Sequence, residues 1–309
     1  MQKIVTIGGG TGQFQILKGL RNYDCEIIAI SNMADDGGSS GKLMDEYGIL
    51  PPGDIRQCMV ALADGEKEKI LRDLFSYRFK KEEGHNLGNL ILTALIDICG
   101  GSAEGIEEAR KLLGVKHEIL PVTLDKAVLC AEDLNGKVLI GESNIDELLG
   151  DSKVVRVFYE KPVFVYKKVA KAIREADKLV ICSGDLYRSI VPTLIVNGIS
   201  EALKESKAKK IYVCNLFTKV GTYGFKASDF VKEIENYSGI TLEKILVNTQ
   251  IPSESVKKKY LSEKSVFVED DMKNDPRIVR GKYVAEYPFE RKTFFRHVPE
   301  KIAREIIGL

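Results

Sequence analysis

The sequence is poor in histidine and has no closely paired cysteines, which argues against a zinc protein and against a disulfide-bonded secreted protein. It holds six Cys and three His in 309 residues, and no two Cys form a C-x-x-C pair. Zinc needs a cluster of such ligands, whereas the three His lie far apart in the chain. Cys182 and Cys214 each end an apolar run, where a free thiol behaves as a small buried apolar group. The cysteines therefore indicate a reducing compartment and predict a cytoplasmic protein.

Long apolar runs and an excess of charge of one sign are also missing. No run approaches the roughly 20 apolar residues of a membrane-spanning helix, and the first residues, MQKIVTI, reach glycine too soon for a signal peptide. The formal net charge is +1, so no overall field attracts nucleic acid or an anionic membrane. We expect no nucleic-acid partner and no membrane span. The sequence leaves open whether the protein forms a homo-oligomer or has protein partners.

Short β-branched runs alternate with helical patterns, which predicts a single α/β domain over residues 1–309. The runs are apolar on both faces, as in EIIAI, and such strands are typical of a parallel sheet that helices cover on both sides. We expect a doubly wound, mainly parallel, Rossmann-like sheet. Its predicted strands are residues 3–7, 26–30, 179–182, 211–214 and 245–247.

Two regions depart from this alternation. Residues from about 54–113 show helical periodicity, and we interpret them as a helical insert. Residues from about 116–160 carry short strands and an Asn-Gly turn signal. We expect a small antiparallel β excursion there, which begins with a strand at 117–122. A last helix is predicted at 299–307, which begins with proline.

The stretch TIGGGTGQF joins the first predicted strand to the first helix, where doubly wound sheets bind phosphate. Glycines let the backbone approach an anion, and the free N–H groups of a helix start point toward it. The dinucleotide fingerprint G-x-G-x-x-G fits only in part, because Gln13 stands at its last position and no acid follows the second strand. We predict a phosphate-binding loop at 8–12 that does not select a dinucleotide. A tight turn without a ligand is the alternative.

The polar segment 32–56 follows the second predicted strand, on the ligand side of an open parallel sheet. Asp35 and Asp36 precede two glycines, which favour a turn, and two serines, whose hydroxyl and N–H groups suit phosphate. One of the two carboxylates could hold Mg²⁺ beside bound phosphates. The other possibility is that it accepts hydrogen bonds from a sugar or a base.

Asp54 and Arg56 follow the rigid turn Pro-Pro-Gly at 51–53. Asp54 is placed to cap the helix that follows, which we favour over a catalytic role. Arg56 could pair with one of the two aspartates of the polar segment or bind phosphate. His85, at the start of another helix, is either an anion contact or acid/base group, or a structural residue.

Five motifs in this order resemble those of the CofD-like family, and most closely its gluconeogenesis-factor branch. They are GGGTG (8–12), ADDGGSSG (34–41), GILPPGDIRQC (48–58), LFSYRF (74–79) and GHNLGNL (84–90). The resemblance implies a doubly wound fold with the ligand across the strand ends. For the transferase branch it implies transfer of 2-phospho-L-lactate from a guanosine diphosphate-linked donor to a deazaflavin, with a divalent metal. For the gluconeogenesis-factor branch it implies a regulatory protein that binds a uridine diphosphate (UDP) sugar and is linked to cell-wall growth and cell shape.

Two loops, CSGDLYRSIVP and NLFTKVGTYGF, depart from the family pattern. The replacements are Ser183, Asp185 and Arg188 for Pro, Ser and Thr in the first loop, and Lys219 and Val220 for Gln and Pro in the second. The second loop also lacks the family's Glu, which weakens any mechanism that needs a carboxylate there.

The resemblance and the loops together define the predicted site. Tyr260 and Arg296 align with aromatic and basic nucleotide contacts, which implies base stacking and an arginine–phosphate pair. The catalytic candidates are Asp35, Asp36 and His85, and the candidate metal ligand is Asp35 or Asp36. The one expected cofactor is Mg²⁺ entering with a nucleotide diphosphate. The predicted ligand-binding residues are Gly9, Gly10, Thr11, Gly12, Asp36, Gly37, Gly38, Ser39, Ser40, Pro52, Gly53, Asp54, Arg56, His85, Asn86, Asn89, Gly184, Asp185, Tyr187, Ser189, Asn215, Thr218, Tyr260 and Arg296.

Overall fold

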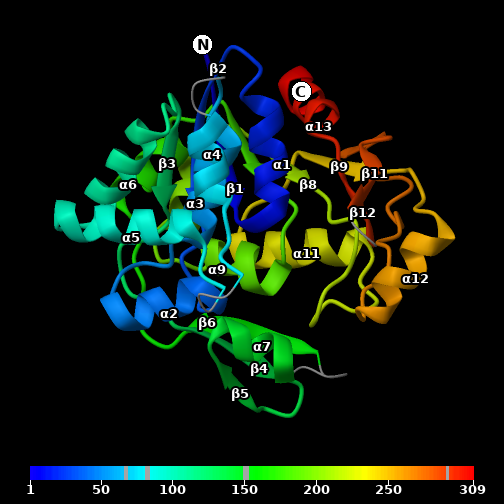
Figure 1. Cartoon of the computed structure of the whole chain (residues 1–309). Coiled ribbons are helices and arrows are strands. Elements are labelled where there is room, and N and C mark those ends of the chain that lie inside the picture. Colours follow the sequence, from blue (N-terminus) through cyan, green and yellow to red (C-terminus); the bar gives the residue numbers. More distant parts are fainter. Residues whose placement is uncertain (66–68, 81–83, 149–152, 290–291) are drawn as a thin grey trace.

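A parallel sheet forms the centre of the protein (Figure 1). It has seven strands in the order β10-β9-β8-β7-β1-β2-β3. The computed structural model describes residues 1–309 except 66–68, 81–83, 149–152 and 290–291. Every neighbouring pair in this sheet runs parallel. The strands are β1 (Gln2–Gly8), β2 (Cys25–Ser31), β3 (Glu118–Pro121), β7 (Lys178–Ile181), β8 (Lys209–Val213), β9 (Lys244–Asn248) and β10 (Ile278–Gly281). The predicted doubly wound parallel sheet is confirmed.

The strand order reverses between β1 and β7, which pair directly with Ile4 opposite Lys178. From β1 the chain proceeds outward through β2 and β3, and from β7 outward through β8, β9 and β10. Such a reversal leaves a crevice at the carboxyl ends of the two strands, because their connections leave in opposite directions. The loops after β1 and β7 therefore face one another.

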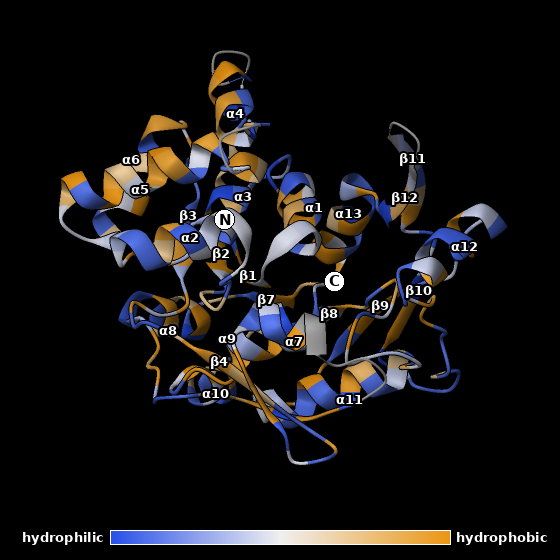
Figure 2. Ribbon diagram, turned by 60° about the horizontal axis from the view of Figure 1, so that its bottom comes forward, coloured by the Kyte–Doolittle hydropathy of each residue, from blue (hydrophilic) through white to orange (hydrophobic). Residues whose placement is uncertain are grey.

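Two layers of helices cover the sheet, one on each side (Figure 2). One layer includes α1, α3 and α13, which pack together, and the other includes α8, α9, α10 and α11. The helices beyond the insert are α1 (Gly10–Leu20), α2 (Gly38–Tyr47), α7 (Glu142–Leu148), α8 (Lys167–Arg174), the π-helical turn η1 (Leu186–Ile190), α9 (Val191–Leu194), α10 (Ile199–Glu205), α11 (Ala227–Ser238), α12 (Glu254–Ser262) and α13 (Pro299–Gly308).

The amphipathic pattern of α11 shows why these segments are helical. Its buried residues Ala227, Phe230, Val231 and Ile234 recur at the spacing of one helix face. None of the described helices is both long enough and apolar enough to cross a membrane. All six cysteines are free thiols.

The predicted helical insert is confirmed, whereas one strand of the predicted β excursion belongs elsewhere. The insert consists of α3 (Gly53–Leu62), α4 (Lys69–Ser76), α5 (Leu87–Cys99) and α6 (Ser102–Leu112). The strand expected at 117–122 is β3, which extends the main sheet parallel to β2. Both Ile119 and Leu120 are buried, as they are in a strand covered on two faces. The separate antiparallel sheet has the order β5-β4-β6, with β4 (Leu129–Asp133), β5 (Val138–Ile140) and β6 (Val154–Tyr159).

A C-terminal hairpin that the sequence did not reveal precedes the last helix. Strand β11 (Val284–Phe289) pairs antiparallel with β12 (Lys292–His297), and α13 follows directly. Helix α13 packs on α1, and its last turn is held by the buried Lys178, whose Nζ donates to the carbonyl oxygens of Ile306 and Ile307 at 2.8 Å each.

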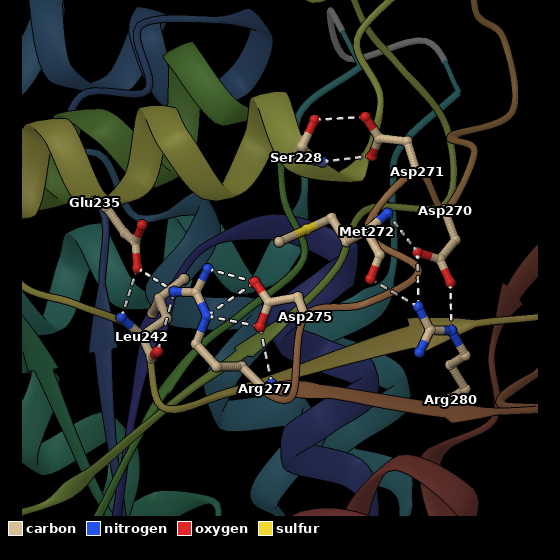
Figure 3. Close-up of polar contacts among 9 residues, drawn as sticks. All are labelled: Ser228, Glu235, Leu242, Asp270, Asp271, Met272, Asp275, Arg277 and Arg280. Atoms are coloured by element: carbon tan, nitrogen blue, oxygen red, sulfur yellow. Dashed lines mark hydrogen bonds and ion pairs between the residues drawn. The ribbon is translucent and has the colours of Figure 1, made fainter.

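Ion pairs hold the edge strand β10 and the segment before it against α11 (Figure 3). Arg277 Nη1 lies 2.7 Å from Glu235 Oε1 of α11, and its Nη2 lies 2.7 Å from Asp275 Oδ2. Arg280 Nε lies 2.6 Å from Asp270 Oδ2, and Asp271 accepts a hydrogen bond from the Ser228 hydroxyl. The Arg277–Glu235 pair and the Ser228–Asp271 bond thus tie the segment around β10 to α11.

Candidate functional site

A cavity of about 690 Å³ opens at the point where the strand order reverses. Its walls come from the loops after β1, β7 and β8, from α12 and from β12. The lining residues are Gly9, Gly10, Thr11, Gly12, Gln15, Ser183, Gly184, Asp185, Arg188, Ser189, Asn215, Leu216, Phe217, Lys219, Val220, Lys259, Tyr260, Glu263, Phe294, Phe295, Arg296 and His297. Segments from both halves of the chain thus meet around one space.

The glycine loop forms the start of α1, and two of its glycines are required by close neighbours. A Cβ on Gly9 would lie 2.1 Å from Asp54 Oδ2, and a Cβ on Gly12 would lie 1.2 Å from the carbonyl oxygen of Ser183. Gly10 has a φ of +61°, in the left-handed region that favours glycine. The first turn of a helix leaves amide groups without intrahelical acceptors, so α1 presents N–H groups to the cavity.

Asp54 does not cap its own helix, because Pro52 is the residue that precedes α3 and Asp54 lies within the first turn. Its Oδ1 instead accepts a hydrogen bond from the backbone N–H of Gly10 at 2.9 Å. Burial raises the pKa of Asp54 to about 7, and the nearby Asp35 carboxylate adds to the shift. The predicted cap is therefore wrong, and Asp54 supports the glycine loop from behind the cavity lining.

Asp36 holds the start of α7 and is poorly placed as a metal ligand. Its carboxylate accepts hydrogen bonds from the Glu142 N–H, the Ser143 N–H and the Ser143 hydroxyl, each at 2.8 Å. Asp35 Oδ1 accepts a hydrogen bond from the Gly37 N–H at 3.1 Å, and burial raises the pKa of Asp35. Across the described ranges, no three His, Cys, Asp or Glu side chains come together as a set of metal ligands. A Mg²⁺ ion held by three or more such side chains is thus not supported among the described residues, whereas Mg²⁺ entering with a nucleotide diphosphate stays a prediction.

A second polar cluster joins the starts of α2 and α5, outside the cavity lining. Ser39 Oγ lies 3.1 Å from His85 Nδ1 and accepts from Asn89 Nδ2 at 3.2 Å. Asn86 caps α5 by accepting from the Asn89 N–H at 3.2 Å. Arg56 donates to Asn89 Oδ1 at 2.8 Å and to a backbone carbonyl of α4, instead of pairing with Asp35 or Asp36. This cluster holds two helix starts together, and a ligand contact by His85 stays a prediction.

Arg188 of the π-helical turn η1 forms an ion pair with Glu142, the first residue of α7. Arg188 Nε lies 2.5 Å from Glu142 Oε1. Burial raises the pKa of Glu142 to about 7, against the opposing effect of Arg188. The Arg188 N–H also donates to Asp185 Oδ1 at 3.2 Å, which caps the π-helical turn η1. Burial raises the pKa of Asp185 to about 6, and Lys219 across the cavity lowers it in part.

Of three predicted ligand-binding residues from the second half of the chain, one lines the cavity and two lie behind its lining. Asn215 lines the cavity, and its Nδ2 donates to the Gly184 carbonyl at 2.6 Å. Tyr187 is buried and its hydroxyl donates to Glu233 at 3.1 Å. Thr218 is fully buried, and its backbone N–H and hydroxyl oxygen both bond to Val266. Tyr187 and Thr218 therefore shape the cavity walls from behind.

The far wall is aromatic and basic. Tyr260 of α12 stacks on Phe217, with ring centroids 3.8 Å apart and planes 10° from parallel. Phe295 packs edge-on against Phe217. The guanidinium of Arg296 lies over the Phe294 ring at 4.7 Å, and no ion pair to Arg296 is found among the described residues. Lys259 Nζ also lies 4.5 Å from the centroid of the Tyr260 ring, so this wall combines stacked aromatic rings with two cationic side chains.

The structure brings part of the predicted set together around the cavity. The predicted residues that line it are Gly9, Gly10, Thr11, Gly12, Gly184, Asp185, Ser189, Asn215, Tyr260 and Arg296. Those outside its lining are Asp36, Gly37, Gly38, Ser39, Ser40, Pro52, Gly53, Asp54, Arg56, His85, Asn86, Asn89, Tyr187 and Thr218.

Sequence reasoning missed several lining residues. They include Gln15, Phe217, Lys219, Lys259, Phe294 and His297. Gln15 lies one helical turn after Gly12 in α1, so its spacing from the glycines could have predicted that it faces the same cavity. The residues of β12 gave no comparable signal, because the hairpin itself was not predicted.

Comparison with known proteins agrees with this arrangement. Residues 4–285 match the family described as "2-phospho-L-lactate transferase CofD". The chain belongs to the CofD family. A Thermotoga maritima relative, provisionally named as a gluconeogenesis factor, is 44% identical, and the match covers 97% of each chain. The "Gluconeogenesis factor" of Bacillus subtilis is 37% identical over 99% of this chain and 98% of that protein.

A solved structure has the same fold over its full length. The crystal structure of a UPF0052-family protein from Bacillus halodurans superposes with a TM-score of 0.92, covering 99% of this chain and all of that one, at 37% identity. The resemblance to the gluconeogenesis-factor branch of the CofD family is confirmed by these relatives.

Proposed function

We propose that this protein is a cytoplasmic gluconeogenesis factor that binds a UDP-sugar in the cavity of about 690 Å³ and regulates cell-wall growth and cell shape. The observation that carries the proposal is the combination around one space of the α1 start, the stacked aromatic pair and Arg296, which has no ion pair among the residues that the structure describes. The volume lies within the roughly 300–1,000 Å³ of small-molecule sites. The name gluconeogenesis factor is that of the relatives; the regulatory part rests on the motif resemblance to that branch, and the cytoplasmic part on six free thiols.

In this proposal the diphosphate lies at the start of α1. Amide groups of Thr11 and Gly12 lie in the first turn, where the helix favours negative charge. The Gly10 N–H is already bonded to Asp54, so these later amides and Arg296 would carry the phosphates. A charge-assisted arginine–phosphate contact is stronger than a neutral hydrogen bond.

In this proposal the uracil base packs on the aromatic wall at the partly exposed Tyr260, because Phe217 behind it is buried. Stacking on flat rings contributes favourably without selecting one base strongly. The sugar then lies toward the segments after β7 and β8, where Asp185 and Ser189 of the first and Asn215 of the second supply polar groups. Specificity for uracil would come from backbone groups of the same walls.

A second candidate, the phospholactyl transferase of the family description, is favoured by the match over residues 4–285. That reaction needs a guanosine diphosphate-linked donor, an acceptor and a divalent metal. Asp36 bonds to α7 through both oxygens, which disfavours it as a metal ligand. The regulatory reading is therefore the main proposal.

The experiment is calorimetric titration and thermal unfolding with a nucleotide panel, with and without Mg²⁺. A ligand at about 100 times its dissociation constant stabilises the folded state by about 2.7 kcal/mol. We expect UDP-N-acetylglucosamine to bind and stabilise without metal and without turnover. Stabilisation by guanosine diphosphate with Mg²⁺ alone would favour the transferase. Stabilisation by neither nucleotide would remove the proposal.

A further inference from the structure

We propose that the hydroxyl of Ser183 donates a hydrogen bond to the anion held at the start of α1, and that His297 is the positioning residue that orients this hydroxyl. The inference rests on the proposed diphosphate site and adds a contact to it. Both residues line the cavity. Ser183 follows β7, whereas His297 ends β12, so the pair joins two separate walls.

The Ser183 hydroxyl lies beside the first turn of α1. A Cβ on Gly12 would lie 3.0 Å from Ser183 Oγ and 1.2 Å from its carbonyl oxygen. Gly12 is the third residue of α1, in the turn whose amide groups lack intrahelical acceptors. An anion that accepts from these amides is therefore within reach of the serine hydroxyl.

The imidazole of His297 is buried and contacts Ser183 through Nδ1. His297 is 5% exposed, and Ser183 Oγ lies 3.4 Å from His297 Nδ1, at the long end of hydrogen bonding. Burial lowers the pKa of His297 to about 4, so the ring is neutral near pH 7. A neutral imidazole carries one proton, either on Nδ1 or on Nε2.

The surroundings of Nε2 decide between the two tautomers. Nε2 is buried and has no hydrogen-bond partner. A proton on Nε2 would create a buried N–H without an acceptor, a rare and costly arrangement. The proton therefore lies on Nδ1 and is donated to Ser183 Oγ. The hydroxyl proton of Ser183 then points away from His297. Because Ser183 lines the cavity, this proton is directed toward the cavity.

This arrangement explains how one hydroxyl can be an oriented donor. A free serine rotor can turn its proton in several directions, whereas the imidazole N–H fixes a lone pair of Oγ on the side of β12. The hydroxyl is thus organised before the ligand arrives, which reduces the entropy that binding must overcome. Ser183 contacts the anion, and His297 acts only through it.

The test measures binding of UDP, uridine and inorganic pyrophosphate by calorimetry. In Ser183→Ala we expect the affinity for UDP and for pyrophosphate to fall on the order of tenfold or more, as for one hydrogen bond to a charged group, while the affinity for uridine is unchanged. His297→Leu should show the same selective loss. His297→Asn should restore most of the affinity, because the asparagine amide can donate from nearly the Nδ1 position.

A spectroscopic measurement keeps the proposal independent of the variants. Nitrogen-15 NMR of labelled histidine should show His297 in the Nδ1–H tautomer at pH 7, and a proton on Nε2 would overturn the orienting role. Unchanged UDP and pyrophosphate binding in a folded Ser183→Ala protein would overturn the contact, and so would an equal loss for uridine. If the wild type binds pyrophosphate but no UDP compound, the UDP-sugar function fails while the Ser183 contact is still tested. If it binds neither, both fail.

Discussion

The carboxylate of Asp54 accepts a hydrogen bond from the N–H of Gly10 at 2.9 Å, so one amide of the glycine loop is bonded within the protein. The contact joins the start of α1 to the first turn of α3. Similar bonds link Asp36 to the start of α7 and Asn86 to that of α5. Side-chain oxygens thus accept hydrogen bonds from backbone N–H groups in the first turns of α1, α5 and α7.

Stability should depend on pH through Asp54. Its pKa is 3.8 in the reference state and about 7 in the folded protein, so the folded state binds a proton more readily. Folding stability therefore falls as pH rises from about 4 to about 7 and then levels off. Glu142 shifts in the same direction. In Asp54→Asn, the loss between pH 5 and pH 8 should be roughly 2–3 kcal/mol smaller than in the wild type, as measured by urea unfolding. Parallel wild-type and variant profiles would contradict this assignment.

Gly12→Ala should destabilise the protein by about 3 kcal/mol or more, because the new Cβ would lie 1.2 Å from the Ser183 carbonyl oxygen. Backbone on both sides must move to relieve the clash. The matched control is Gly308→Ala in α13, where an added Cβ meets no atom within 4 Å. The control should unfold within about 1 kcal/mol of the wild type in thermal or urea unfolding. Equal stabilities of the two variants would show that the loops after β1 and β7 are not in contact.

Asp36→Ala should loosen α7, because the helix start loses three hydrogen bonds of 2.8 Å. We expect a loss of about 1–3 kcal/mol and faster hydrogen exchange at the amides of Glu142 and Ser143. Asp45→Ala is the control, since Asp45 is exposed on α2. If Asp36 is instead a metal ligand, Asp36→Ala would abolish a Mg²⁺ dependence of binding and leave exchange in α7 unchanged.

Tyr260→Ala should weaken uridine and UDP to the same extent, on the order of tenfold, because it removes a ring of the aromatic wall without touching the phosphate contacts. Tyr260→Phe should bind both within about twofold. Tyr223→Ala is the control, since Tyr223 is exposed and does not line the cavity. A loss for UDP alone, measured by calorimetry, would place Tyr260 near the phosphates instead of the base.

Local sequence patterns predicted the segments that position the site. The apolar strand ending at Ile7, the glycines and the helical pattern after them predicted the strand-to-helix turn, because these signals lie within a few residues, although α1 begins earlier than predicted, at Gly10. Local patterns do not state which sheet a strand joins, and so β3 was assigned to the antiparallel excursion. The short sequence TFFRH of β12 offers little alternation, and the residues on it were found only in part.

Side-chain partners far apart in the chain were beyond such reasoning. Asp54 has the sequence context of a helix cap, yet its carboxylate bonds to Gly10, 44 residues away. Arg56 could be read as an ion-pair partner, whereas Asn89 accepts its hydrogen bond. Ser183 and His297 are 114 residues apart. Only the packing of α1, β7 and β12 brings these groups together.

The C-terminal segment connects the cavity to the opposite end of the sheet. Arg296 and His297 lie at the cavity, the next residues begin α13, and the last turn of α13 is clasped by Lys178 at the amino end of β7. A molecule seated against β12 therefore touches one end of a continuous segment whose other end is bonded to the central sheet.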